Sequence, residues 1–269
     1  MRLTLLNSRK YYLLFLAGAF SILNIFLILL SNYQSLFSYA YTIFLFTILQ
    51  HLIVEKEFFI RNYLVLQLYV LLALLLYQAQ LVIMPDWNGF SGMYGTVGTD
   101  DSRYYAGVAD DISSIPTIAR GYIGMDHSFV KFLNVLYPFK ITHPLTILIP
   151  NLLGIGLVPY FTYRTSYSLT SDHKTSKTAY ILVMICPVIL SNGLILMRDG
   201  WTAILIIAGI YYLLEKRIFQ YIIAFLLLSY LRLGSSILLA IAPLFYLKRF
   251  FFSGSLFLQF LKISAAIIA

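Results

Sequence analysis

The sequence predicts an all-α membrane protein, a polytopic helix bundle with about nine transmembrane segments and one large extracytoplasmic loop. Hydrophobic residues make up 60% of the 269 residues and charged residues only 11%, whereas soluble domains carry about 45–50% and about 25%. The apolar residues also gather in runs close to the roughly 20 residues that a membrane helix needs. These observations exclude an ordinary soluble globule, and residues 1–269 are predicted to form a single integral membrane domain.

The predicted segments follow each other along the chain with one long interruption. They are Tyr11–Leu30, Leu36–Val54, Tyr63–Met84, Pro144–Tyr163, Ala179–Met197, Trp201–Leu214, Ile218–Leu231, Ser235–Leu247 and Phe250–Ala269. The first follows basic residues as a signal peptide does, but its apolar run is about twice as long, so we expect an uncleaved anchor. Several of the later segments are short, and two of them would fit half-spans or re-entrant segments instead.

The distribution of charge predicts the orientation of the bundle. If the N-terminus is cytoplasmic, the segments on that side together carry the whole net charge of +8, and those on the other side sum to neutrality. Basic residues concentrate on the cytoplasmic side of membrane proteins. We therefore expect a protein of the cytoplasmic (inner) membrane with its N-terminus inside. The chain has no Lys/Arg-rich tract, so no nucleic-acid partner is expected.

Residues 85–143 form the predicted extracytoplasmic loop. This stretch holds six aspartates and seven of the fifteen glycines. A loop longer than about 15 residues is usually functional or disordered, and this one contains too many aromatic residues for disorder. We expect it to fold against the membrane surface.

A short amphipathic helix is predicted within this loop, over residues 100–112, with Asp100 and Asp101 in its first turn. Carboxylates there suit the positive end of the helix dipole. Helical spacing groups a set of polar side chains on two adjoining stripes of its surface: Asp100, Arg103, Tyr104 and Asp111. Such a surface suits acid/base chemistry on a hydroxyl or the binding of a divalent cation through oxygen ligands. The alternative is a solvated amphipathic helix without a catalytic role.

Asp126 and His127 are a second candidate pair in the loop. A histidine within reach of a carboxylate can serve as a base or as a ligand. An ordinary polar contact within the loop remains the alternative for this pair.

Three charged residues near the ends of later segments form the third candidate group. Arg198 and Asp199 interrupt apolar sequence, and Arg232 ends the seventh predicted segment on the same side. A helix N-terminus beside an arginine is a binding site for anions, and the two arginines together are placed to bind a pyrophosphate. The alternatives are an ion pair that marks the end of a span and an arginine that reaches to the lipid headgroups.

The run Arg198-Asp199-Gly200-Trp201-Thr202-Ala203, the basic turn Glu215-Lys216-Arg217 and the run Arg232-Leu233-Gly234-Ser235-Ser236-Ile237 resemble EpsG/Wzy-type bacterial polysaccharide polymerases. Asp199 stands where that group often has glutamine, and no histidine lies near Ser235. The run Asp100-Asp101-Ser102-Arg103-Tyr104-Tyr105 is similar to the acidic, tyrosine-containing outer loop of GT-C glycosyltransferases. Family members are usually longer, so the end of the chain within an apolar run at Ala269 would fit a fragment or a truncated copy.

The resemblance implies a function on lipid-linked sugars. The substrate would be a polyprenyl-pyrophosphate-linked glycan in the bilayer, used for surface polysaccharide or O-antigen synthesis. Asp100 or Asp101 would act as the base, with no certain cofactor beyond a possible divalent cation, and Arg198 and Arg232 would bind the pyrophosphate. A chain-length regulator would be a partner. The alternative function is a flippase or transporter of the same lipid-linked oligosaccharides.

Overall fold

The computed structural model describes residues 2–90 and 100–251, and all regular structure within these ranges is helical. Five helical stretches are long and apolar enough to cross a membrane: Tyr11–Ser31, Ser35–Ile53, Lys56–Ile83, Pro144–Thr170 and His173–Ser191. Three shorter apolar helices follow them. The predicted all-α class is thus confirmed for the described residues, and their composition suits a lipid environment. The ninth predicted segment, 250–269, lies almost wholly outside the described residues.

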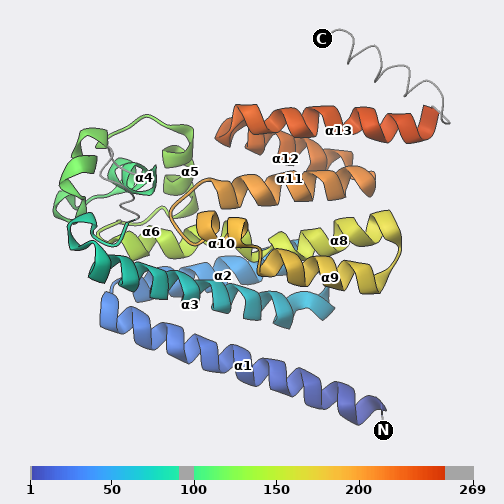
Figure 1. Cartoon of the computed structure of the whole chain (residues 1–269), viewed down its shortest axis with the longest axis horizontal. Coiled ribbons are helices and arrows are strands. Elements are labelled where there is room, and N and C mark those ends of the chain that lie inside the picture. The colour runs from blue at the N-terminus through green and yellow to red at the C-terminus, as the bar shows by residue number, and fades with distance from the viewer. Residues whose placement is uncertain (1, 91–99, 252–269) are drawn as a thin grey trace.

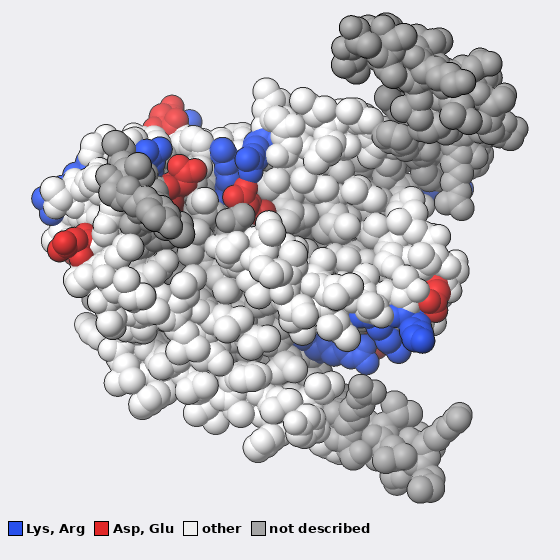
Figure 2. Space-filling model, in the orientation of Figure 1, with Lys and Arg blue, Asp and Glu red and all other residues white. Residues whose placement is uncertain are grey.

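The long helices run roughly along the longest axis of the molecule, so that the connections between them gather at two opposite ends (Figure 1). We name these the aspartate end, with residues 32–34, 84–90, 100–143, 194–199 and 232, and the lysine end, with residues 54–61, 164–178 and 211–217. Figure 2 shows charged side chains in two separate groups, at upper left and lower right, with uncharged surface between them in this view.

The first three predicted segments correspond to α1 (Arg2–Ser31), α2 (Ser35–Ile53) and α3 (Phe59–Ile83), with the single-turn η1 (Lys56–Phe58) before α3. Buried amides join them: Asn24 Nδ2 donates to Gln67 Oε1 at 2.8 Å, and the Tyr39 hydroxyl donates to the same oxygen at 2.6 Å. Interhelical hydrogen bonds of this kind hold helices together where lipid offers no hydrophobic driving force.

The fourth predicted segment is a broken helix in the middle of the bundle. It consists of α6 (Pro144–Asn151), α7 (Leu153–Gly156) and α8 (Val158–Thr170), and 94% of its most apolar window is buried. Pro150 lies inside α6 and Pro159 in the first turn of α8. Since proline has no N–H to donate, Pro150 removes a helical hydrogen bond close to the first break, whereas Pro159 suits the first turn of α8, where an N–H has no helical partner.

The fifth predicted segment is also broken. The helix α9 (His173–Met184) is separated from α10 (Pro187–Gly193) by a non-helical step before Pro187. Beyond α10 the backbone is irregular, so the predicted helix up to Met197 is wrong in its last four residues. The side-chain amide of Asn151 donates to the carbonyls of Ile195 and Met197, both at 3.2 Å. These bonds satisfy backbone groups that a helix would have paired.

The remaining apolar helices are α11 (Asp199–Leu214), α12 (Ile218–Leu231) and α13 (Leu233–Phe251). The 16 residues of α11 extend about 24 Å, less than the roughly 30 Å hydrocarbon core of a bilayer. Glycine lets the start of α11 approach the centre of the bundle, because a Cβ on Gly154 of α7 would lie 3.0 Å from the backbone nitrogen of Trp201.

The aspartate end is built from short helices. They are η2 (Pro85–Trp87), α4 (Asp100–Val108), η4 (Ile112–Ser114), η5 (Thr117–Tyr122) and α5 (Ser128–Leu136). Their core is continuous with that of the bundle, since fully buried Tyr105, Phe129 and Leu133 belong to the same hydrophobic cluster as the long helices. Residues 100–143 therefore form a folded part of the molecule.

Candidate functional site

Charged residues from three separate parts of the chain meet at the aspartate end around the side chain of Tyr104. Burial raises the pKa of this phenol. Charged groups from the start of α11, from α4 and from the end of α12 also affect this pKa. They are Arg198, Asp100, Asp199 and Arg232. Together with Arg103, Tyr104 and His127, we name them the arginine–aspartate cluster. Residues about a hundred positions apart in sequence therefore lie within electrostatic range of Tyr104.

The position of α4 depends on its close packing against α5. A Cβ on Gly107 would lie 2.8 Å from the side chain of Val130, so only glycine allows this approach without a shift. The packing places the Tyr104 ring 5.3 Å from the ring of His127 and 4.8 Å, edge to face, from that of Phe129. Edge-to-face aromatic pairs of this kind fix the orientation of the rings.

The two adjacent aspartates of α4 have different surroundings. The Asp100 side chain is 49% exposed and lies 3.6 Å from the guanidinium of Arg103, which also stacks over the ring of Tyr122 at 4.8 Å. Asp101 is 1% exposed, and its carboxylate accepts from the Ser102 N–H at 2.8 Å. Of these two carboxylates, only that of Asp100 is therefore accessible to a ligand.

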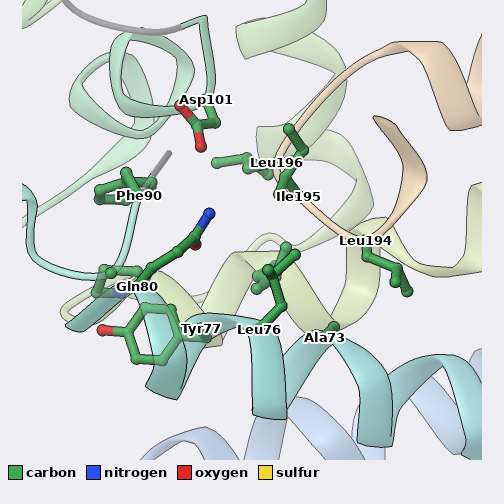
Figure 3. Close-up of a pocket in the computed structure, with 12 residues that line it drawn as sticks. Ala73, Leu76, Tyr77, Gln80, Phe90, Asp101, Leu194, Ile195 and Leu196 are labelled. Carbon is green, nitrogen blue, oxygen red and sulfur yellow. The ribbon is translucent and has the colours of Figure 1, made fainter. Parts of the chain in front are cut away.

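Asp101 faces the interior of the molecule. With Gln80 of α3 and Phe90 it lines a cavity of about 10 Å³, which also borders the irregular stretch at Leu194–Leu196 (Figure 3). About 10–15 Å³ is the least volume that holds one water molecule. Asp101 thus contributes to the join between α4 and the bundle.

His127 caps the helix α5 and has a defined tautomer in its neutral form. Its Nδ1 accepts from the N–H of Phe129 at 3.1 Å, so the proton of the neutral ring is on Nε2. Burial lowers the pKa of His127, and the nearby Arg198 lowers it further. A neutral His127 with Nε2–H can donate a hydrogen bond to a ligand, but it would have to give up the cap to act as a base.

Arg198 and Arg232, two of the three arginines of the cluster, differ in their pairing. Arg232 forms an ion pair with Asp199, and both side chains are partly exposed. Within residues 2–90 and 100–251, Arg198 forms no ion pair with a carboxylate. Because exposed ion pairs contribute only about 0–1 kcal/mol, an anion with more than one charge can compete with Asp199 for Arg232.

An aromatic row that sequence reasoning missed lies beneath the cluster. Phe129 stacks on Phe132 with ring centroids 6.1 Å apart, and Phe132 meets the ring of Trp201 edge to face at 4.8 Å. The Trp201 indole N–H donates to Asn151 Oδ1 at 3.0 Å. Asn151 is a single asparagine within an apolar segment. This could have indicated a structural role in the sequence, since a buried amide needs hydrogen-bond partners.

Two predicted site residues lie away from the cluster. The predicted helix up to Ile112 is wrong, because α4 ends at Val108. Beyond it, the Asp110 N–H donates to the Ile141 carbonyl at 2.8 Å, and Asp110 Oδ2 accepts from the Ile141 N–H at 2.6 Å. Asp111 therefore leaves the face of Asp100 and Tyr104, and it caps η4 by accepting from the Ser113 N–H at 2.9 Å.

Asp126 is the second predicted site residue that lies away from the arginine–aspartate cluster. It pairs with Lys131 at 2.7 Å, and this pairing lowers the pKa of its carboxyl. Its side chain is 78% exposed, so the predicted joint role of Asp126 with His127 is not seen in the geometry.

In the described part of the chain, no three His, Cys, Asp or Glu side chains come together closely enough to hold a metal ion. The chain matches no known protein family, no curated protein and no solved structure. Its function therefore has to be inferred from the site itself.

Proposed function

We propose that the chain transfers or polymerises sugar units carried on polyprenyl pyrophosphate, at the outer face of the cytoplasmic membrane, in surface polysaccharide or O-antigen biosynthesis. The observation that supports this proposal most is the convergence of Asp100, His127, Arg198 and Arg232 at one end of an apolar helix bundle. In this proposal the chain belongs with the EpsG/Wzy-type polymerases that it resembles, with about nine spans and residues 85–143 as the extracytoplasmic loop.

The orientation in the proposal comes from charge. The residues of the lysine end carry a net charge of +3, and the aspartate end carries seven of the eight aspartates of the chain. The positive-inside rule then places the lysine end and the N-terminus in the cytoplasm. The arginine–aspartate cluster faces the outer leaflet, where a lipid-linked oligosaccharide presents its pyrophosphate.

The proposed reaction is attack by an acceptor hydroxyl oxygen on the anomeric carbon of the lipid-linked sugar. A new C–O bond forms to that carbon, and its bond to the pyrophosphate oxygen breaks. Asp100 takes the proton of the hydroxyl as a general base. Arg198, helped by Arg232, stabilises the negative charge that develops on the leaving pyrophosphate.

The remaining residues of the cluster orient the substrate. The Nε2–H of His127 is a donor for a sugar or phosphate oxygen, and Arg103 holds Asp100 in place at 3.6 Å. Tyr104 remains protonated because burial raises its pKa, so its hydroxyl can donate or accept. No soluble nucleotide sugar takes part.

Purified protein in lipid nanodiscs, supplied with polyprenyl-pyrophosphate oligosaccharide, tests the proposal. The expected result is a ladder of longer glycans with release of polyprenyl pyrophosphate. Glycans of unchanged length, from protein that remains folded, would contradict it.

A flippase of lipid-linked oligosaccharides is the second candidate, and the breaks in α6–α8 and α9–α10 favour it. Broken helices next to each other are common in transporters, where they line substrate sites at mid-membrane. Sealed vesicles with fluorescent lipid-linked glycan on one side distinguish the two functions. A flippase moves the glycan across without lengthening it, whereas the proposed transferase lengthens it without moving it.

A further inference from the structure

An open pocket lies at the aspartate end outside the arginine–aspartate cluster. Its volume is about 580 Å³, and its polar and aromatic lining comes from η2, η4 and η5. The residues that matter for its chemistry are Asp86, Trp87, Asn88, Ser113, Thr117 and Arg120. We name it the Trp87 pocket. This volume falls in the range of about 300–1,000 Å³ that is typical of small-ligand sites.

The backbone on both sides of the pocket is held in place by hydrogen bonds. Asn88 adopts a left-handed conformation with φ of 50°, and its side-chain amide donates to the Ser114 carbonyl at 2.8 Å. The hydroxyl of Tyr105, in α4, forms a hydrogen bond with Ser114 Oγ at 2.6 Å. The η2 and η4 walls are thus tied to each other and to α4, so the pocket is formed before a ligand binds.

The chemistry of the lining fits a carbohydrate ring. An indole offers a flat apolar surface together with a polar edge, and Trp87 is only partly buried. Around it, Asp86 and Arg120 are exposed charges of opposite sign, and Asn88, Ser113 and Thr117 supply neutral polar groups. A neutral sugar has hydroxyls that both donate and accept, and the C–H face of its ring is apolar. An anionic ligand would gain from Arg120 but be repelled by Asp86.

The pocket is connected to the arginine–aspartate cluster through η5. Thr117, at the start of η5, lines the pocket, and Tyr122, at its end, stacks under Arg103 at 4.8 Å. Five steps of a 3₁₀-helix at about 2 Å each give about 10 Å. A short oligosaccharide can span that distance.

We infer that the Trp87 pocket binds a neutral sugar ring of the acceptor glycan, a few sugar units away from the hydroxyl that reacts at Asp100. This inference rests on the proposed function for the identity of the glycan. The binding of sugar in the pocket can be measured without any transfer reaction.

The test is saturation-transfer NMR on the full chain in lipid nanodiscs, with a neutral methyl hexoside and a linear neutral trisaccharide as probes. The expected result is transfer from the protein to the sugar ring protons, stronger for the trisaccharide. Trp87→Ala is expected to weaken binding about tenfold or more, since truncation of a central aromatic contact has effects of this size. Tyr33→Ala is the matched control, because Tyr33 is an aromatic residue in the turn between α1 and α2 and is 71% exposed.

Equal saturation transfer in wild type and in Trp87→Ala would overturn the inference and leave Trp87 as an anchor at the membrane interface. No transfer to either probe at up to about 10 mM would overturn it as well. The two proposals fail separately. If sugar binding depends on Trp87 but the wild type does not extend glycan chains, the proposed transferase function is wrong and the proposed sugar site stands. If the wild type extends chains but binds neither probe, only the proposed sugar site is wrong.

Discussion

The two ends of the bundle contain similar side chains in different states of pairing. At the lysine end, Arg164 of α8 pairs with Glu55 and donates to the Tyr211 hydroxyl of α11 at 3.2 Å, and Ser168 donates to Glu215 at 2.6 Å. The Arg164 side chain is 17% exposed. At the aspartate end, Asp100 is half exposed, and Arg198 has no ion pair within the described residues.

The difference separates a structural clamp from a candidate binding site. The contacts of Arg164 join three segments of the chain, which leaves its guanidinium little capacity for a ligand. Arg198 carries the same charge at the N-terminus of α11, where the helix dipole favours anions. We conclude that pairing and exposure, more than residue type, distinguish the candidate site from the rest of the molecule.

The largest effect is expected from the two neighbouring aspartates. Asp100→Asn removes the proposed base and should slow transfer by about 100-fold or more, with little change in stability because the side chain is half exposed. Asp101→Asn alters a buried acceptor and should lower the free energy of unfolding by about 1–3 kcal/mol. Chain-extension rates and thermal unfolding in detergent measure both. Equal loss of rate in the two variants at equal stability would contradict the different roles.

The clamp at the lysine end gives the next largest effect. Arg164→Gln leaves Glu55 and Tyr211 without their partner and should lower the free energy of unfolding by about 2 kcal/mol. The transfer rate per folded molecule should not change. Arg217→Gln, an exposed arginine at the same end, is the control for loss of charge alone. A fall in transfer rate without a fall in stability would mean that Arg164 acts on the substrate.

The smallest effect is a dependence of stability on pH. Burial and Arg198 lower the pKa of His127 in the folded state below its usual 6.5, so the unfolded chain binds the proton more tightly. The contribution of neutral His127 is therefore complete above pH 6.5 and is lost as the pH falls below that value through the folded-state pKa. His127→Asn keeps a side chain that can cap α5 and should flatten this part of the stability profile. An unchanged profile in the variant would assign the dependence to another group.

The sequence predicted the helices where the apolar pattern alone determines them. The first three segments agree with α1, α2 and α3 to within a few residues at most ends, because long apolar runs bounded by polar turns leave one solution. The breaks at Leu152, Leu157 and Cys186 were not predicted. A count of apolar residues does not take account of proline. It also does not reveal the hydrogen bonds from the side chain of Asn151 to the backbone of a segment far along the chain.

The candidate site was predicted in part for a similar reason. Local spacing identified Asp100, Arg103 and Tyr104 as one surface. Arg198, Asp199 and Arg232 were grouped because they lie at the ends of predicted segments on the same side. The burial of Asp101 and the early end of α4 at Val108 depend on contacts with residues far along the chain, such as Ile141. The contribution of Trp201, Asn151 and the aromatic row likewise follows only from tertiary packing.

The central claim is that the aspartate end binds the pyrophosphate of a lipid-linked sugar through Arg198. The most direct test is the affinity of polyprenyl pyrophosphate for the protein in nanodiscs, compared among wild type, Arg198→Ala and Arg217→Ala at the opposite end. Since a charge-assisted hydrogen bond contributes about 1.5–3 kcal/mol, Arg198→Ala should bind about 10-fold to 100-fold more weakly, and Arg217→Ala should bind as the wild type does. Equal affinity in all three proteins, or an equal loss in both variants, would contradict the account.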